Sequence, residues 1–264
     1  MTRAPALFLS HGSPMFALEP GLLGPKLQQL GAGLRDVRAV LVVSPHWQTL
    51  HKVRVLATAA PETIHDFGGF PPPLYELQYP APGAPDAAAE AARLLRDAGF
   101  EVELDPRRGR DHGAWVPMRH LLPEARLPVF QVSMPNDLST DAALELGRAL
   151  APLRDAGVLV VGSGSLTHNL YEFRQHIDDP EYAQQFADWI ASAVARNDID
   201  ALVDYRRRAP HAARAHPTEE HYLPLLVALG ASDERDRAHR IEGGLTYGTL
   251  SMDSYAWGSP ASAS

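Results

Sequence analysis

Twelve histidines and the absence of cysteine define the chemistry open to this 264-residue chain. Three histidines stand at the ends of apolar runs: His11 follows LFLS, His46 follows VVSP, and His168 comes shortly after VVGSG. Imidazole is a common protein ligand for zinc, copper and iron, and a chain without thiolates must hold such metals with imidazole and carboxylate. This pattern suggests a histidine metal site. Spacing alone does not distinguish that site from capping or core histidines, because no HxH or HExxH motif is present.

Two other polar stretches could line a site. Residues 63–70, TIHDFGGF, place His65 and Asp66 beside two glycines and two phenylalanines. Such a segment is typical of a substrate-lining loop, and equally of an ordinary glycine turn. Asp111 and His112 stand at an expected helix start. An aspartate there either orients the imidazole for proton transfer or simply caps the helix.

The histidines fall where short apolar runs meet amphipathic stretches, and this alternation predicts the elements that position them. We expect strands at Ala6–Leu9, Ala39–Ser44, Val53–Thr58, Val102–Leu104, Pro128–Ser133, Val158–Val161 and Gly248–Met252. We expect helices at Ala84–Ala98, Thr140–Ala156, Glu181–Arg196, Ile199–Arg207 and His221–Leu229. Alternating strands and helices predict an α/β fold: a three-layer α/β/α single domain over residues 1–264, with a mostly parallel or mixed central sheet.

Two of the expected strands are apolar on both faces, at Ala39–Val43 and Val158–Val161. Such strands are typical of the centre of a sheet that helices cover on both sides. In open α/β sheets, ligands bind beyond the carboxyl ends of the strands. We therefore expect His11, His46 and His168 to converge on one crevice, although they come from distant parts of the chain.

Composition and charge exclude several classes of function. The formal charge of −8 and the dispersed arginines disfavour nucleic acid, because an acidic chain repels phosphate backbones. Disulfides, iron–sulfur clusters and thiolate zinc sites are excluded without cysteine. No apolar run is long enough for a signal-peptide core or a membrane span. We expect a cytoplasmic protein that does not bind membranes.

Read in order, seven motifs resemble the class III extradiol ring-cleavage dioxygenases, and in particular their 4,5-DOPA extradiol dioxygenase branch. The motifs are LFLSHGSPM at Leu7–Met15, SPHW at Ser44–Trp47, TIHDFGGFP at Thr63–Pro71, YPAPG at Tyr79–Gly83, DHGAW at Asp111–Trp115, VGSGSLTHNL at Val161–Leu170 and EEHYLPLLVALGA at Glu219–Ala231. No single motif is specific, but the ordered set covers nearly the whole chain, from Leu7 to about Met252.

The resemblance implies a divalent metal held by His11, His46 and His221. In the family, the residue that corresponds to His168 either binds the metal or lies beside it as an acid or base. We therefore treat His168 as a candidate for both roles, metal ligand and acid or base. Many extradiol enzymes use two histidines and one carboxylate. The DOPA branch replaces the carboxylate with histidine, although Glu219 and Glu220, just before His221, could still bring a carboxylate to the metal.

The resemblance also implies roles for the polar stretches. His112 matches a histidine that contacts bound oxygen or substrate, and His65 and Asp66 would lie nearby in the substrate pocket. An all-histidine site carries one more positive charge than the usual triad, which favours an anionic catecholate.

The resulting interpretation is a metal-dependent extradiol dioxygenase that opens a catechol such as DOPA with O2. We expect one metal per chain, Fe(II) in the active protein, and Zn(II) in purified protein, because zinc binds nitrogen sites more tightly but cannot change oxidation state. The alternatives are a zinc-dependent hydrolase and a non-enzymatic protein that binds a metal or a partner on the same fold. A homo-oligomer is compatible with the sequence.

Overall fold

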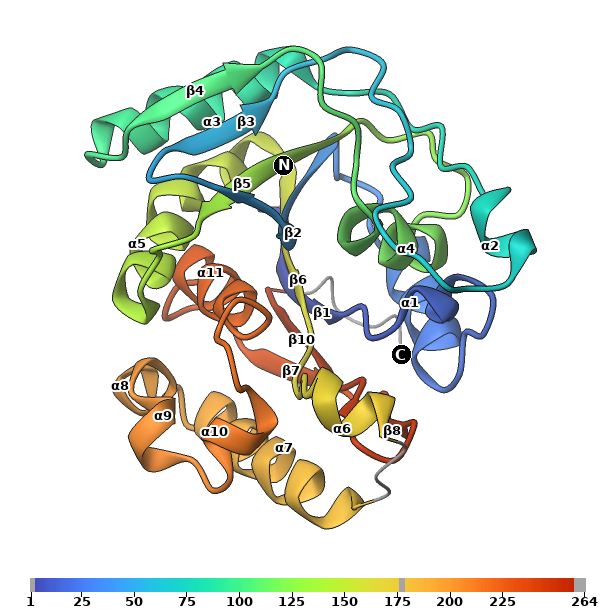
Figure 1. The fold of residues 1–264 in the computed structure, drawn as a ribbon. Helices are drawn as coiled ribbons and strands as arrows, with labels where there is room; N and C mark the ends of the chain where they lie inside the picture. Colours follow the sequence, from blue (N-terminus) through green and yellow to red (C-terminus); the bar gives the residue numbers. More distant parts are fainter. Residues whose placement is uncertain (1–2, 176–178, 259–264) are drawn as a thin grey trace.

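An eight-stranded mixed sheet with helices on both faces forms the frame of this computed structural model, which describes residues 3–175 and 179–258 (Figure 1). Its strands are β1 Ala6–Ser10, β2 Ala39–Thr49, β3 Val53–Leu56, β4 Val102–Asp105, β5 Val129–Pro135, β6 Val158–Gly164, β7 Ala238–Ile241 and β10 Ser254–Trp257. They lie in the order β4-β3-β5-β2-β6-β1-β10-β7. The predicted three-layer α/β architecture with a mostly parallel or mixed sheet is thus confirmed.

The four central strands run parallel, in the order β5, β2, β6, β1. Their carboxyl ends therefore meet at one edge. The pairs β3/β5, β1/β10 and β10/β7 are antiparallel. Strands β2 and β6 are apolar on both faces because helices cover both faces of this parallel core.

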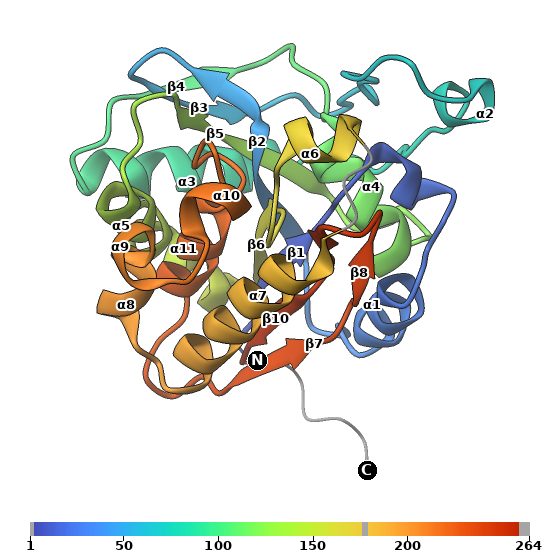
Figure 2. The same ribbon diagram turned by 60° about the horizontal axis from the view of Figure 1, so that its bottom comes forward.

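The helices divide between the two faces (Figures 1 and 2). They are α1 Leu23–Ala32, α2 Pro72–Tyr75, α3 Pro85–Asp97, α4 His112–Leu121, α5 Thr140–Leu150, α6 Leu170–Arg174, α7 Pro180–Ala195, α8 Ile199–Val203, α9 Tyr205–Arg208, α10 Ala212–Ala215 and α11 Leu223–Ala231. Short 3-10 helices lie at Pro14–Ala17 and Ala151–Ala156. Helices α3, α5, α7 and α11 contribute to one buried cluster, and α1 and α4 to the other. Within the described ranges, no helix combines the length and apolar character that a membrane span requires.

Two predicted elements differ from the structure, and two strands of the sheet were missed. The expected strand Gly248–Met252 is wrong: only Leu250–Ser251 pairs, in a small hairpin with β8, Leu245–Thr246, outside the main sheet. The edge strand β7 and its neighbour β10 were not predicted. The helix expected over Thr140–Ala156 becomes a 3-10 helix from Ala151, because Pro152 has no N–H to continue the α-helical ladder.

The last two predicted helices also shift. The expected helix Ile199–Arg207 is divided at Asp204 into α8 and α9. The expected helix His221–Leu229 begins two residues later, so that His221 lies on the segment before α11. All nine residues of α11 are buried, as expected of a helix that is apolar on every side.

Candidate metal centre

Three histidines meet at the carboxyl edge of the parallel strands. His11 directly follows β1, His46 lies near the end of β2, and His221 precedes α11. The ring centroids of His11 and His46 are 5.0 Å apart, those of His11 and His221 5.5 Å, and those of His46 and His221 5.1 Å. One nitrogen from each ring lies within 4.8 Å of the other two. This is the set that the resemblance implied.

The Nε2 atom of His11 is free to bind a metal because its other nitrogen is engaged. The Ser163 hydroxyl donates to the Gly113 carbonyl, so it accepts a hydrogen bond from His11 Nδ1 at 2.9 Å. His46 Nε2 lies 3.1 Å from His11 Nε2. Two nitrogens that bind one ion at about 2.0–2.1 Å, with an angle of about 90–110° between them, are about 2.8–3.4 Å apart. The observed separation fits a shared metal.

The third nitrogen is a buried acceptor without a partner. His221 Nδ1 donates to the Glu220 carboxylate at 3.0 Å, which leaves the lone pair on Nε2. Among the described residues, this buried Nε2 has no hydrogen-bond partner. An unsatisfied buried polar atom costs about 1–3 kcal/mol. A metal ion would satisfy Nε2, so the three histidines fit the metal that the chemistry requires.

Burial keeps these ligands in the form that binds metal. Desolvation, followed by the charges of neighbouring histidines, lowers the pKa of His11 and of His221 well below 6.5. Desolvation and His112 likewise lower the pKa of His46, against a smaller opposing effect of Asp66. Neutral imidazole is the ligand form of histidine, so the site is ready to bind a cation at neutral pH.

Local sequence explains how His46 leaves the sheet. Pro45 has no N–H to donate to the ladder, and the pairing of β2 with β5 shifts register between Val43 and Gln48. Within this irregular stretch, the Ser44 hydroxyl donates to buried Asp111 at 2.9 Å and accepts from the His46 backbone N–H at 3.3 Å. The strand therefore presents His46 at a fixed point of the crevice.

The glycines of the VGSGS motif let the His221 segment lie directly on β6. A Cβ atom at Gly162 would come within 1.9 Å of the Pro224 carbonyl oxygen, and one at Gly164 within 2.3 Å of the His221 carbonyl oxygen. Ser165 N–H donates to that same His221 carbonyl at 3.1 Å. The motif thus brings His221 to the site, which sequence reasoning about the motif did not reveal.

Gly113 allows helix α4 to approach His46, and this contact yields a testable expectation. A Cβ atom at Gly113 would lie 2.2 Å from Ser44 Oγ and 2.9 Å from His46 Cδ2. We expect Gly113→Ala to displace His46 and weaken metal binding by about 10- to 100-fold, the usual range for groups that orient metal ligands. A chelator-competition titration measures the change, with Gly68→Ala, which meets nothing within 4 Å, as the control. Equal affinity in the Gly113 variant and the parent would show that this contact does not orient His46.

His112 lies against the metal ligands at the first position of α4. Its ring centroid is 3.8 Å from that of His46 and 5.7 Å from that of His11. Asp66 accepts both the His112 backbone N–H at 2.8 Å and its Nδ1 at 3.0 Å. Asp111 instead caps the helix through the Ala114 N–H, so of the two roles open to Asp111 the structure supports capping.

The pKa values of the two carboxyl groups near this helix end shift in opposite directions. Burial alone would raise the pKa of Asp66, but the hydrogen bonds and the charge of His112 bring it below the ordinary value. Burial, reinforced by the charge of Asp66, raises the pKa of Asp111. The Asp111 carboxyl is fully buried and also accepts from the Gln131 side chain at 2.8 Å.

His168 stands beside the three converging histidines. It stacks on His221 with ring centroids 3.4 Å apart and an interplanar angle of 12°. Its possible ligand atom groups with those of Glu220 and His221, and not with those of His11 and His46. Burial, followed by the charge of His112, lowers the pKa of His168 to about 4, so the ring is neutral at neutral pH.

Aromatic residues form a wall beside His112. The ring centroid of Phe67 lies 5.5 Å from that of His112 and 6.3 Å from that of Trp115. His65 packs edge-on against both Phe67 and Trp115, and its Nε2 donates to the Leu77 carbonyl at 2.9 Å. The 63–70 stretch is thus a loop that brings an aromatic face, a histidine and a carboxylate next to the candidate metal centre.

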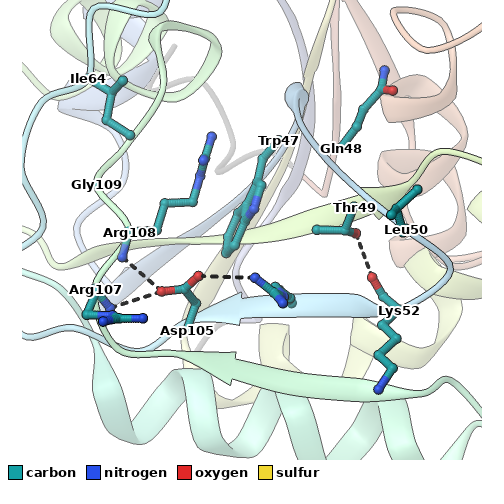
Figure 3. Close-up of a pocket in the computed structure, with 11 residues that line it drawn as sticks. Trp47, Gln48, Thr49, Leu50, Lys52, Ile64, Asp105, Arg107, Arg108 and Gly109 are labelled. Atoms are coloured by element: carbon teal, nitrogen blue, oxygen red, sulfur yellow. Dashed lines mark hydrogen bonds and ion pairs between the residues drawn. The ribbon is translucent and has the colours of Figure 1, made fainter.

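A separate polar cavity of about 670 Å³ adjoins the strand that carries His46 (Figure 3). Arg108 lies over the Trp47 ring, 4.8 Å from its centroid, and donates to the His46 carbonyl at 3.3 Å. None of the site histidines lines this cavity. Arg108, which lines this cavity, therefore helps to hold the backbone of β2 at His46.

Comparison with known proteins agrees with the fold and identifies the family. The family model described as "Catalytic LigB subunit of aromatic ring-opening dioxygenase" matches residues 5–256. This chain therefore belongs to the extradiol aromatic ring-opening dioxygenases, and within them to the 4,5-DOPA dioxygenase family. Enzymes of this family use a metal, typically Fe(II), and act on an aromatic diol with O2.

The relatives cover almost the whole chain. The chain is 41% identical over 257 residues to "4,5-DOPA dioxygenase extradiol" of Escherichia coli K12, covering 95% of this chain and 93% of the relative. It is 38% identical over 253 residues to the protein of the same name from Beta vulgaris, covering 94% of each. A crystal structure of an uncharacterised protein from Escherichia coli K12 matches with a TM-score of 0.80 and 35% identity, over 96% of this chain and 99% of that one.

Proposed function

We propose that this chain binds one Fe(II) ion through His11, His46 and His221 and opens the ring of a catechol such as DOPA with O2. The observation that supports this most directly is the convergence of three neutral imidazoles on one point, with the Nε2 of His221 buried and unpartnered. The choice of DOPA rests on the names of relatives that are 38% and 41% identical. By the usual order of metal affinities, purified protein carries Zn(II) and is inactive in that form.

When bound, Fe(II) supplies open coordination positions and a change of oxidation state, which ring opening with O2 requires. The protein supplies the ligands, the proton acceptors and the shape of the pocket. Three neutral histidines leave the full positive charge of the ion in place, which favours a catecholate over a neutral phenol. His168, neutral at neutral pH, can accept a catechol proton, and His112 can hold or return one beside the site.

His65 and Phe67 form part of the wall of the substrate pocket in this proposal, and Asp66 lies beside them, bonded to His112. An aromatic ring packs edge-to-face or offset against Phe67, and such a pair contributes about 0.5–1.5 kcal/mol beyond its buried area. Trp115 is fully buried and packs against Phe67 from within the protein. This wall lies beside His112, so a ring held there would lie within reach of both the metal ligands and His112.

Anaerobic reconstitution tests the proposal. Metal-free protein is loaded with Fe(II), mixed with L-DOPA or another catechol, and then exposed to oxygen. We expect oxygen uptake together with formation of a ring-opened product that absorbs visible light. The same protein loaded with Zn(II) serves as the control and should consume no oxygen. If the iron-loaded protein cleaves no catechol in a broad panel, the proposal is wrong.

A further inference from the structure

We propose that Asp66 is a positioning residue that fixes one tautomer and one orientation of His112, so that His112 Nε2 is the nitrogen that serves the reaction. This inference rests on the proposed function, and it gives Asp66 a role through His112 in place of direct contact with substrate. It follows from hydrogen bonds of the described residues and from the way the Asp66 loop is anchored.

The two oxygens of Asp66 hold His112 at two points. Oδ1 accepts the His112 backbone N–H at 2.8 Å, and Oδ2 accepts Nδ1 at 3.0 Å. An ionised carboxylate can only accept hydrogen bonds, so Nδ1 must carry the proton. In the neutral form of the ring, the lone pair is therefore on Nε2. Because one bond fixes the backbone and the other the ring, the imidazole has little freedom to rotate.

The loop that carries Asp66 is anchored next to the start of α4. Ile64 N–H donates to the Arg110 carbonyl at 2.8 Å, and Arg110 N–H donates to the Glu62 carbonyl at 2.7 Å. Trp115 Nε1 donates to the Ile64 carbonyl at 2.8 Å. These bonds join the residues before Asp66 to the residues around His112. The carboxylate and the imidazole therefore belong to one rigid unit.

Buried Arg110 strengthens that anchor. Its guanidinium is fully buried and donates to backbone carbonyls instead of to a carboxylate. The acceptors are the carbonyls of Pro61, Tyr79, Ala81, Pro82 and Val129. These carbonyls belong to the segments on either side of the 63–70 loop and to β5. The cation thus ties both ends of the loop to the sheet, which explains how a glycine-containing loop can hold an imidazole in place.

Asp66 contacts the metal ligands only weakly. Its Oδ2 is 3.9 Å from His46 Nδ1, beyond hydrogen-bond distance, whereas both of its oxygens bond to His112. A carboxylate that orients a catalytic imidazole usually acts by holding the required tautomer. We therefore expect the effect of Asp66 on the reaction to pass through His112 and not through metal affinity.

The substitution Asp66→Asn tests this directly. The amide oxygen can still accept the His112 N–H, but the amide NH2 cannot accept a bond from Nδ1–H. We expect kcat to fall by about 100-fold, at the lower end of the range for acid–base catalysis. KM for the catechol and Fe(II) content should stay within about twofold of the parent. The control is Asp137→Asn, which removes the carboxylate from an exposed pair with His51 at 2.8 Å and should leave kcat unchanged.

Two further measurements separate positioning from a merely structural role. In the His112→Gln background, Asp66→Asn should lower kcat no further, because residues that act as a unit are not additive. Long-range 1H–15N NMR of the zinc-loaded protein should show the Nδ1–H tautomer of His112 in the parent and the loss of that state in Asp66→Asn. Equal losses of kcat in both backgrounds, or an unchanged tautomer, would overturn the inference.

These measurements also separate this inference from the proposed function. The NMR experiment needs neither iron nor turnover. If the parent protein cleaves no catechol while Asp66→Asn still changes the tautomer of His112, the proposed function fails and the positioning role of Asp66 stands. If the parent is active but the tautomer is unchanged in the variant, the proposed function stands and the positioning role fails.

Discussion

Replacing His11 with alanine is expected to remove the bound metal and abolish ring cleavage. In the proposed site, His11 binds the metal together with His46 and His221, and its Nε2 lies 3.1 Å from that of His46. Two remaining imidazoles cannot hold a divalent ion against competing water and buffer as three can. Metal analysis after anaerobic Fe(II) loading and gel filtration measures the occupancy, and oxygen uptake with L-DOPA measures the activity.

The matched control is His239→Ala. This histidine is exposed on the edge strand β7, and its removal should leave occupancy and activity unchanged. Circular dichroism and the elution volume check that the His11 variant remains folded. His11 is buried, and its Nδ1 bonds to Ser163, so some loss of stability is expected. Full metal occupancy in a folded His11→Ala protein would remove His11 from the ligand set.

The sequence was sufficient to place two of the proposed ligands at the same edge of the sheet. His11 follows β1 and His46 lies near the end of β2, two strands of the parallel core, and the carboxyl ends of parallel strands lie at one edge whatever their distance along the chain. The central strands β2 and β6 could also be predicted, because strands that helices cover on both faces are apolar on both faces. These features depend on local composition and period, which sequence reveals.

The remaining parts of the site depend on long-range contacts that sequence does not specify. His221 reaches the site only because Gly162 and Gly164 leave room for its backbone on β6, and the spacing of these residues does not indicate such an approach. Likewise, the DHGAW motif suggested Asp111 as the partner of His112, but the partner is Asp66, 46 residues earlier. Only the fold of the 63–70 loop brings that carboxylate to the imidazole.

The edge of the sheet was mispredicted for a similar reason. Strand β7, AHRI, has exposed polar side chains and no alternating apolar pattern, so it pairs with β10 without a local signal. The predicted strand around Leu250 has buried apolar residues, but only Leu250–Ser251 pairs, and it pairs with β8 outside the main sheet. Edge strands depend on the neighbour that pairs with them more than on their own sequence.

Metal-free protein is expected to lose stability steeply as the pH falls below about 6.5. Burial holds the pKa of His168 near 4 and that of His216 near 3, and lowers those of His11, His46 and His221 well below 6.5. In the unfolded chain, each of these histidines takes up a proton near pH 6.5, whereas in the folded protein it does not. The stability they contribute is therefore present above pH 6.5 and is lost as the pH falls toward the folded pKa values.

The size of this effect is large for a protein of ordinary stability. Well below pH 6.5, each such histidine lowers the free energy of unfolding by about 1.4 kcal/mol per pH unit. Several acting together remove an amount comparable to a typical total stability of about 5–15 kcal/mol. A bound metal opposes the loss because it stabilises the folded state with neutral ligands. We expect metal-free protein to unfold at a higher pH than metal-loaded protein.

Urea denaturation of metal-free protein between pH 7 and pH 4 measures this dependence. His216 provides a test outside the ligand set: it is fully buried, and its Nε2 bonds to the Leu166 carbonyl at 2.8 Å. Replacing His216 with phenylalanine removes one linked proton, so the slope of unfolding free energy against pH should fall by about 1.4 kcal/mol per pH unit, whatever the change in absolute stability. The exposed control His239→Ala should keep the parent slope. A parent protein whose unfolding free energy is constant between pH 6.5 and pH 4 would show that these histidines are not buried in their neutral form.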